Sequence, residues 1–482
     1  MKKLTYLPVL FFVAIGFAQE TNQTAYKKRV LETAEVDFLT SYYTQQGDNA
    51  SVTGGIGTEK LSDFTPTIVI SIPLNADDVL TIDAGISTYT SASSSNLNPF
   101  DISGASRGGD DDDDDDDDDH GGNNAGNVIG SPWVASSGAS RQDTWGNLNI
   151  DYSHSSDDRN TVWNADVSLA TEYDYFSLGF GGGLVKQFNE KNTTLGISTK
   201  IYLDQWMPKY PTELDSYVEV NGNLNQGFFE GITILDQNGD ASTNWRPVSG
   251  FGLIDNKSRN SYSLSFSFSQ ILNKNSQFSL FFDLVQQKGW LANPMQRVYF
   301  ADVNNYYIGN AESIDNYTSL SNRDVFQLAD DIERLPNTRF KVPIGIRFHY
   351  YLNEILSLRT YYRYYFDDWG IRSNTASVEL PIKVSQKFTL YPSYRYYNQT
   401  AADYFAPFEE NLSTSAYYTS DYDLSEFSAN QFGFGISYTD IFSNAHVWKF
   451  GLKSIDLKYN NYKRNSGLKA NIISAGFKFV ME

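Results

Sequence analysis

The chain has no cysteine among its 482 residues, which excludes disulfide bonds and thiolate metal sites. After the first 18 residues it also lacks any apolar run near the roughly 18 residues that a membrane-spanning helix needs. Basic residues are outnumbered by acidic ones, so the formal net charge is −21. No basic stripe of the kind that binds nucleic acid is present, so we expect no nucleic-acid partner.

The N-terminus has the features of a secretory signal peptide. Met1-Lys2-Lys3 is a short basic head, the next fourteen residues are almost entirely apolar, and small residues up to Ala18 form a cleavage signal. We therefore expect residues 1–18 to be removed near Ala18 and residues 19–34 to form a periplasmic N-terminal segment. No cysteine follows the apolar run, so lipoprotein processing is not expected.

What the sequence does contain is tyrosine and phenylalanine, with 33 and 32 residues, and this composition favours many β-strands. The pattern is clearest in segment 356–369 (LSLRTYYRYYFDDW). Leu358, Tyr362 and Phe366 fall on one face of an extended chain, while Arg359 and Arg363 fall on the other. In a soluble sandwich the charged face would meet water, whereas in a membrane barrel the arginines would line a wet lumen.

The connections between strand-like segments decide between these two folds. We predict about sixteen strands, and short polar connections alternate along the chain with connections that include every long segment. Bacterial outer-membrane barrels have this alternation, because their periplasmic turns are short and their extracellular loops long. We therefore predict an all-β, transmembrane, antiparallel up-and-down β-barrel over residues 35–482, with both ends in the periplasm. The predicted strands are 35–45, 65–74, 78–91, 142–155, 161–172, 175–188, 193–205, 260–271, 276–287, 339–351, 355–367, 374–384, 387–399, 430–440, 446–461 and 468–481, and the long loops are 46–64, 92–141, 206–259, 288–338 and 400–429.

Several phrases resemble a known family. They are SGASR at 137–141, YSHSSDDRN at 152–160, LDQW at 203–206 with YPTEL at 210–214, DIERLP at 331–336, RTYYRYY at 359–365 and WKFGLK at 448–453. Together they are similar to the family known as domain of unknown function 3570, over nearly the whole mature chain. The resemblance implies an exported barrel in the outer membrane of a Gram-negative bacterium and implies no particular activity. It also suggests a setting near exported redox proteins.

Charged residues on the predicted lumen face form two groups. By strand parity the second half of the chain contributes basic residues and the first half acidic ones. Fixed charges of this kind select ions and polar solutes in channels, but they also pair locally and rigidify plugged barrels, and both interpretations stay open here. The basic group is Lys341, Arg347, His349, Arg359, Arg363, Lys383 and Arg395; the acidic group is Asp37, Asp83, Asp151 and Asp166.

The loop 92–141 contains ten consecutive aspartates, Asp110 to Asp119, followed by His120. Ten like charges flanked by glycine favour a solvated low-complexity tract. Diffuse cation binding, for instance loosely bound Ca²⁺, is the alternative, since hard cations prefer oxygen ligands. The run offers no ligand spacing for a specific metal site, so we expect no resident metal or cofactor. His154 lies beside Ser155 and Asp157, but such neighbours on a tight turn rarely form a catalytic site.

Three functions follow from these patterns. The first is a channel for small polar or anionic solutes. The second is a non-conducting outer-membrane scaffold, or a partner of an exported redox or lipoprotein system. The third, an outer-membrane hydrolase, has little support because no convergent nucleophile and base can be named, so we expect no enzyme. Other expected partners are outer-membrane lipid and the barrel assembly machinery, which would read the amphipathic last strand.

Overall fold

The structure is a computed structural model that describes residues 29–90, 130–135, 143–172, 174–322, 324–440, 443 and 445–481. The predicted signal peptide, most of the predicted segment 19–34 and the aspartate run with His120 lie outside these residues.

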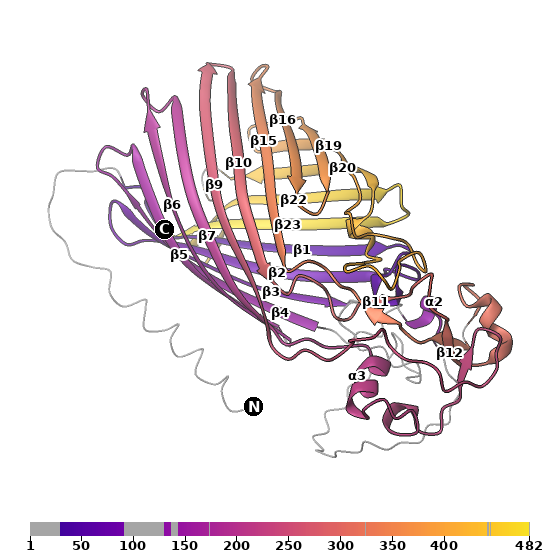
Figure 1. Cartoon of the computed structure of the whole chain (residues 1–482). Helices are drawn as coiled ribbons and strands as arrows, with labels where there is room; N and C mark the ends of the chain where they lie inside the picture. Colours follow the sequence, from indigo (N-terminus) through magenta and orange to yellow (C-terminus); the bar gives the residue numbers. More distant parts are fainter. Residues whose placement is uncertain are drawn as a thin grey trace.

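One antiparallel sheet forms a closed barrel (Figure 1). Neighbouring strands pair in chain order, and the last strand pairs with the first, so that Glu35 lies opposite Val480. Among the described residues the wall has sixteen positions, which confirms the prediction. The wall strands are β1 (Glu35–Gln46), β2 (Leu61–Pro73), β3 (Asp78–Thr90), β4 (Asp143–Ser155), β5 (Thr161–Thr171), β6 (Tyr175–Phe188), β7 (Thr193–Trp206), β9 (Lys257–Asn273), β10 (Ser276–Gly289), β15 (Thr338–Tyr351), β16 (Ser357–Asp367), β17 (Arg372–Glu379), β19 (Phe388–Gln399), β20 (Phe427–Thr439), β22 (Phe450–Arg464) and β23 (Lys469–Met481).

Two short strands continue wall positions rather than adding new ones. β18 (Ile382–Lys383) extends the ladder of β17 along β19, and β21 (His446–Val447) extends that of β20 along β22. The predicted strand 374–384 is therefore divided, and Pro381 lies at the division. Proline has no N–H to donate to a ladder, so it interrupts regular pairing.

The outer surface of the wall is apolar. Large side chains on alternate positions point away from the lumen and are exposed, for instance Phe432 at 62%, Ile86 at 54% and Leu184 at 45%. A closed barrel satisfies its backbone hydrogen bonds between strands, which allows it to lie in lipid. An apolar outer surface of this kind is stable against lipid rather than water. No helix among the described residues is long and apolar enough to cross a membrane.

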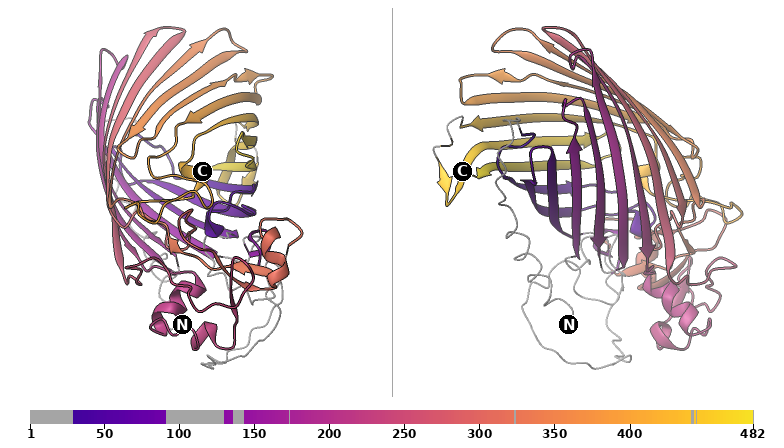
Figure 2. Two further views of the ribbon diagram at one scale, coloured as in Figure 1. Left: turned by 45° about the vertical axis from the view of Figure 1, so that its right-hand side comes forward. Right: turned by 90° about the vertical axis from the view of Figure 1, so that its left-hand side faces the viewer.

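The two ends of the barrel differ. The even-numbered connections, such as 189–192 and 274–275, are tight turns, and the long segments all emerge at the opposite end (Figures 1 and 2). We call these the turn end and the loop end. β1 begins and β23 finishes at the turn end. The predicted parity of long and short connections is therefore confirmed.

Four long loops fold together into a structure that we call the cap. It comprises the β1–β2 loop (47–60), the β7–β9 loop (207–256), the β10–β15 loop (290–337) and the β19–β20 loop (400–426). Trp245, Phe229 and Leu214 belong to its buried core. The cap elements are η2 (Ser51–Thr53), α3 (Thr212–Glu219), η4 (Gly227–Phe229), β8 (Ile234–Asp236), β11 (Arg297–Val298), β12 (Tyr306–Gly309), η5 (Ala311–Asn316), β13 (Val325–Gln327), β14 (Asp331–Ile332) and η6 (Tyr422–Leu424), and α2 (Pro132–Ala135) lies in the β3–β4 loop.

Candidate functional site: two charged walls beneath a folded cap

The seven predicted basic residues lie on one stretch of the barrel wall. β15 carries three of them, β16 two, and β18 and β19 one each. Register aligns them, because His349 pairs with Arg359 across one ladder. Arg347 and Arg395 lie in one row, separated by Tyr361 and Ser377 on the two strands between them. We call Lys341, Arg347, His349, Arg359, Arg363, Lys383 and Arg395 the basic wall. Their positions alternate with the exposed apolar side chains, which places them on the lumen face.

Most of the basic wall has no acidic partner. Arg359 forms an ion pair with Glu379 at 2.9 Å. Among the described residues, no carboxylate lies within ion-pair distance of the other six side chains. The Nε atom of Arg363 is buried and has no hydrogen-bond partner in the described part of the chain. The wall therefore keeps a net positive charge that faces the lumen.

Arg347 is held by aromatic rings rather than by a carboxylate. Its guanidinium lies 5.3 Å from the ring centroid of Phe281 and 5.6 Å from that of Tyr361. These two rings stack at 5.8 Å with an interplanar angle of 12°. Gly345 makes the arrangement possible, since a Cβ atom at that position would collide with the Phe281 ring. Contact with ring faces holds a guanidinium without neutralising it, so Arg347 remains available to an anion.

The four predicted acidic residues form a second wall, which we call the acidic wall: Asp37 on β1, Asp83 on β3, Asp151 on β4 and Asp166 on β5. Asp166 forms an ion pair with Lys200, and Asp37 lies 3.4 Å from Lys478. Asp151 accepts a hydrogen bond of 2.7 Å from the Asn164 amide. Three of the four carboxylates are thus engaged by neighbours in the wall, and the Oδ1 atom of Asp83 is buried without a hydrogen-bond partner among the residues that the structure describes.

The two walls face each other across the barrel. β4 is the fourth strand of the ring and β17, in the middle of the basic wall, is the twelfth. In a closed ring of sixteen strands these positions are opposite. The lumen consequently has one side with unpaired basic groups and one side whose acidic groups are mostly paired.

The cap spans the mouth of the barrel above these walls. The β1–β2 and β10–β15 loops start eight strands apart in the ring of sixteen, so their attachment points are opposite. The two loops nevertheless meet, because Nη1 of Arg297 donates a hydrogen bond of 3.1 Å to the carbonyl of Val52. Arg297 also makes a bidentate ion pair with Glu213 of α3, at 2.7 and 2.9 Å, and both side chains are fully buried.

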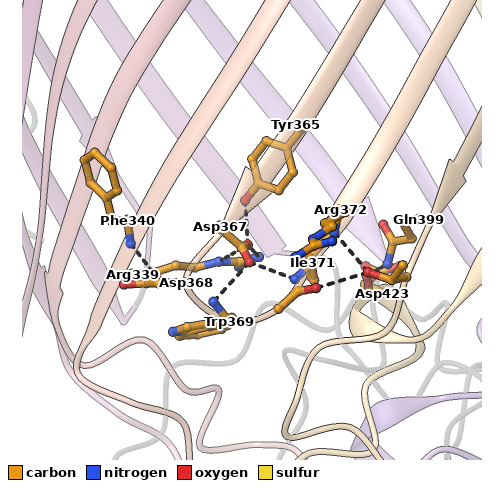
Figure 3. Close-up of polar contacts among 12 residues, drawn as sticks. Arg339, Phe340, Tyr365, Asp367, Asp368, Trp369, Ile371, Arg372, Gln399 and Asp423 are labelled. Carbon is orange, nitrogen blue, oxygen red and sulfur yellow. Dashed lines mark hydrogen bonds and ion pairs between the residues drawn. The ribbon is translucent and has the colours of Figure 1, made fainter.

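The rim beside the basic wall is fixed by Asp367 (Figure 3). This buried carboxylate accepts hydrogen bonds from Arg339 at 2.5 and 2.9 Å, from the Tyr365 hydroxyl at 2.7 Å, and from the backbone N–H groups of Trp369 and Ile371. The Arg339 guanidinium lies 4.3 Å above the Trp369 ring. The network holds the β16–β17 turn against β15. The sequence pattern does not reveal this network, although Asp367 and Arg363 share a strand face.

Buried carboxylates lie where the β10–β15 loop meets the β19–β20 loop. Glu333 accepts hydrogen bonds from the Thr419 hydroxyl at 2.5 Å and the Asn293 backbone at 2.7 Å, and burial raises its pKa to about 8. Burial likewise raises the pKa of Asp330 to about 7 and that of Asp421 to about 6. This cluster was not predicted from the sequence, where its only signal is the DIERLP phrase of the family resemblance.

The other predicted sites have simpler positions. His154 lies at the turn end, where Nδ1 is 2.5 Å from Asp78, away from both walls. Asp110 and Asp119 lie outside the described residues. Within the described ranges, no cluster of three or more His, Asp or Glu side chains is arranged to hold a metal ion.

Comparisons with known proteins identify one family and several solved structures that the chain is similar to. The sequence profile of the family described as "Protein of unknown function (DUF3570)" matches residues 9–476. No curated protein matches the sequence. Among solved structures, the chain is similar to a bacterial polysaccharide outer membrane secretin, with 8% identity over 93% of this chain and 98% of that one and a TM-score of 0.40. It is also similar to the Pseudomonas putida toluene transporter TodX, with 8% identity over 94% of this chain and 90% of that one and a TM-score of 0.35. Its identity to the Pseudomonas aeruginosa ferric enterobactin receptor (PfeA) is 11%, over 92% of this chain and 54% of that one, with a TM-score of 0.37.

Proposed function

Because the chain belongs to DUF3570, a family without an assigned function, its own geometry has to indicate its role, and we propose that it is an outer-membrane channel for small anionic solutes. The observation that carries this proposal is the basic wall, in which six of seven side chains have no carboxylate within ion-pair distance among the described residues. A wall built for rigidity would pair these charges, as Asp166 pairs with Lys200 and Asp37 with Lys478 in the acidic wall.

The chemistry of the basic wall favours organic or inorganic anions. Four of its members are arginines, whose planar guanidinium groups bind carboxylate and phosphate oxygens in a bidentate manner. At physiological ionic strength exposed charges are screened over about 8 Å. Selectivity therefore requires solutes to pass close to Arg347, Arg363 and Arg395. The proposal includes no catalytic step.

The location completes the proposal. We propose that the chain is exported from the cytoplasm of a Gram-negative bacterium with cleavage near Ala18, and that the assembly machinery inserts the barrel with the cap outside the cell. The apolar outer surface and the gathering of long loops at one end support this orientation.

Conductance in planar bilayers tests the proposal. Under a KCl gradient, the reversal potential of the wild-type protein is expected to indicate preference for chloride. The triple variant Arg347→Gln, Arg363→Gln, Arg395→Gln should lose most of that preference, because it removes unpaired lumen charge. A matched control removes three lysines from the turns at the turn end, Lys191→Gln, Lys274→Gln and Lys387→Gln. The channel is refuted by absent conductance, and the solute class by conductance that prefers cations or is indifferent to the triple change.

A second candidate is a closed scaffold that serves an exported redox or lipoprotein system. The cap favours it, because loops from opposite sides of the ring share a buried core across the mouth. This candidate predicts no wild-type conductance together with a specific partner recovered by crosslinking in intact cells. Recovery of no periplasmic or lipoprotein partner would count against it.

A further inference from the structure

An apolar groove with a volume of about 580 Å³ lies in the outer surface of the barrel. It crosses β6, β7, β9, β10 and β15 near the turn end. Two rows of outward side chains line it, and strand register holds each row together. Leu195, Phe268 and Leu280 form one row; Ile197, Phe266 and Phe282 form the other.

The groove is apolar along its length and basic at one end. Among the described residues, Lys186 is the only charged one that lines the groove. Its Nζ lies 5.5 Å from the ring centroid of Phe188. Both residues are exposed and close β6 just before the 189–192 turn. Lys191 and Lys274 lie in turns at the same end of the barrel, where Glu190, Asp158 and Glu354 also stand in the turns. Lys186 lines the groove itself, whereas none of these acidic residues does, so this end of the groove favours an anionic group.

We propose that this groove binds one glycerophospholipid from the leaflet at the turn end, with its acyl chains along the two rows and its phosphate on Lys186. The apolar rows supply a surface that only hydrocarbon covers in a membrane. A lysine at the end of an apolar groove keeps its charge at the level of the headgroups, where it meets phosphate. The inference depends on the membrane placement of the barrel and not on conduction.

Lys387 supplies a matched control elsewhere on the barrel. It lies in the 384–387 turn at the turn end, whereas Lys186 lies at the end of β6; both are exposed, and the Nζ of Lys387 lies 5.8 Å from the ring centroid of Tyr438. It does not line the groove. A lysine beside an aromatic ring at the membrane surface is thus present at both sites, and only one of them has the apolar groove.

Native mass spectrometry of the full-length protein, delipidated in detergent and then titrated with phosphatidylglycerol, tests the inference. The wild type and Lys387→Glu should each retain one lipid at low lipid concentration, and Lys186→Glu should bind it several-fold more weakly. Diacylglycerol, which lacks the phosphate, should bind the wild type no better than it binds Lys186→Glu.

A second variant protects the test against misfolding. Ile197→Trp fills the groove from an outward position that a barrel tolerates, and it should weaken phosphatidylglycerol binding without altering heat-modifiable migration on gels. Equal lipid retention by wild type, Lys186→Glu and Ile197→Trp would overturn the inference, as would retention of diacylglycerol as strong as that of phosphatidylglycerol. Lipid binding and the reversal potential are measured in separate experiments. A failure of the lipid inference is therefore distinguishable from a failure of the proposed channel.

Discussion

The barrel and the cap place their large apolar side chains in opposite environments. In the barrel, Phe432, Ile86 and other large apolar side chains point outward and stay exposed, whereas in the cap Trp245 and Phe229 are 0% and 1% exposed. The reason is that lipid surrounds the wall of the barrel, whereas water surrounds the cap. The hydrophobic effect drives apolar groups out of water and not out of lipid, so the cap is held by its core and the barrel by its closed ladder of hydrogen bonds. One chain therefore contains two structures that respond differently to the same kind of substitution.

Charged groups show the same contrast. In the cap, Arg297 and Glu213 are fully buried and bind each other in a bidentate manner. In the lumen, Arg359 pairs with Glu379 while its side chain remains 49% exposed. A buried pair depends strongly on both partners, because the removal of one leaves an unpaired charge in a poor solvent. In the lumen, water solvates the charge that is left when one partner is removed.

The substitution Arg297→Met should produce the largest difference between the two regions. Loss of one member of a buried pair costs about 3–5 kcal/mol, and the loss falls on the cap alone. Hydrogen exchange should become faster across 207–256 and 290–337 while heat-modifiable gel migration of the barrel stays unchanged. The control Arg359→Met should alter neither, since exposed pairs contribute about 0–1 kcal/mol. Unchanged exchange in the Arg297→Met cap would contradict the structure.

A smaller separation is expected from the deletion of aromatic rings. Trp245→Ala removes a fully buried side chain and should destabilise the cap by about 3 kcal/mol or more, measured as faster protease cutting within the cap loops. Phe432→Ala removes a ring from the outer surface of the barrel and leaves the core of the cap intact, so protease cutting within the cap loops should not accelerate. If Phe432→Ala accelerates this cutting as much as Trp245→Ala does, the separation of the outer surface from the core of the cap is wrong.

The smallest effect is a dependence of the cap on pH. Burial raises the pKa of Glu333 to about 8 from an ordinary value of 4.5. The folded cap therefore holds a proton that the unfolded loop releases between these values, and its contribution to stability is complete below 4.5 and gone above about 8. Protease cutting of the cap should accelerate as pH rises from 6 to 9. Glu333→Gln should flatten this profile, and a profile identical to that of the wild type would refute the role of Glu333.

Strand positions and the alternation of long and short connections were predictable from the sequence, because both depend on local pattern. Side chains alternate along an extended chain, so Leu358, Tyr362 and Arg359 reveal their faces without knowledge of the partner strands. Errors occurred at the edges: β2 begins at Leu61 rather than at residue 65, and Pro381 divides one predicted strand. The face of each wall residue followed from the same parity.

The pairing state of those wall residues could not be read in the same way. Whether a lumen charge is free depends on its neighbours across the ladders, and Asp166 meets Lys200 while Arg395 meets Ser377 and Gln431. The two interpretations that the sequence left open, selectivity and local pairing, therefore apply to opposite sides of one lumen. The rim network around Asp367 was equally out of reach, since its donors Arg339 and Tyr365 come from two strands.

By itself the sequence determined a sixteen-strand barrel with its long loops at one end, because alternation with a period of two is written in each strand separately. Only the tertiary structure decided that the loops form a cap and that most of the basic wall has no carboxylate partner among the described residues. Arg297 contacts Glu213, 84 residues away, and Val52, 245 residues away. Such contacts depend on where loops from opposite sides of a closed ring meet, and no local periodicity encodes that distance.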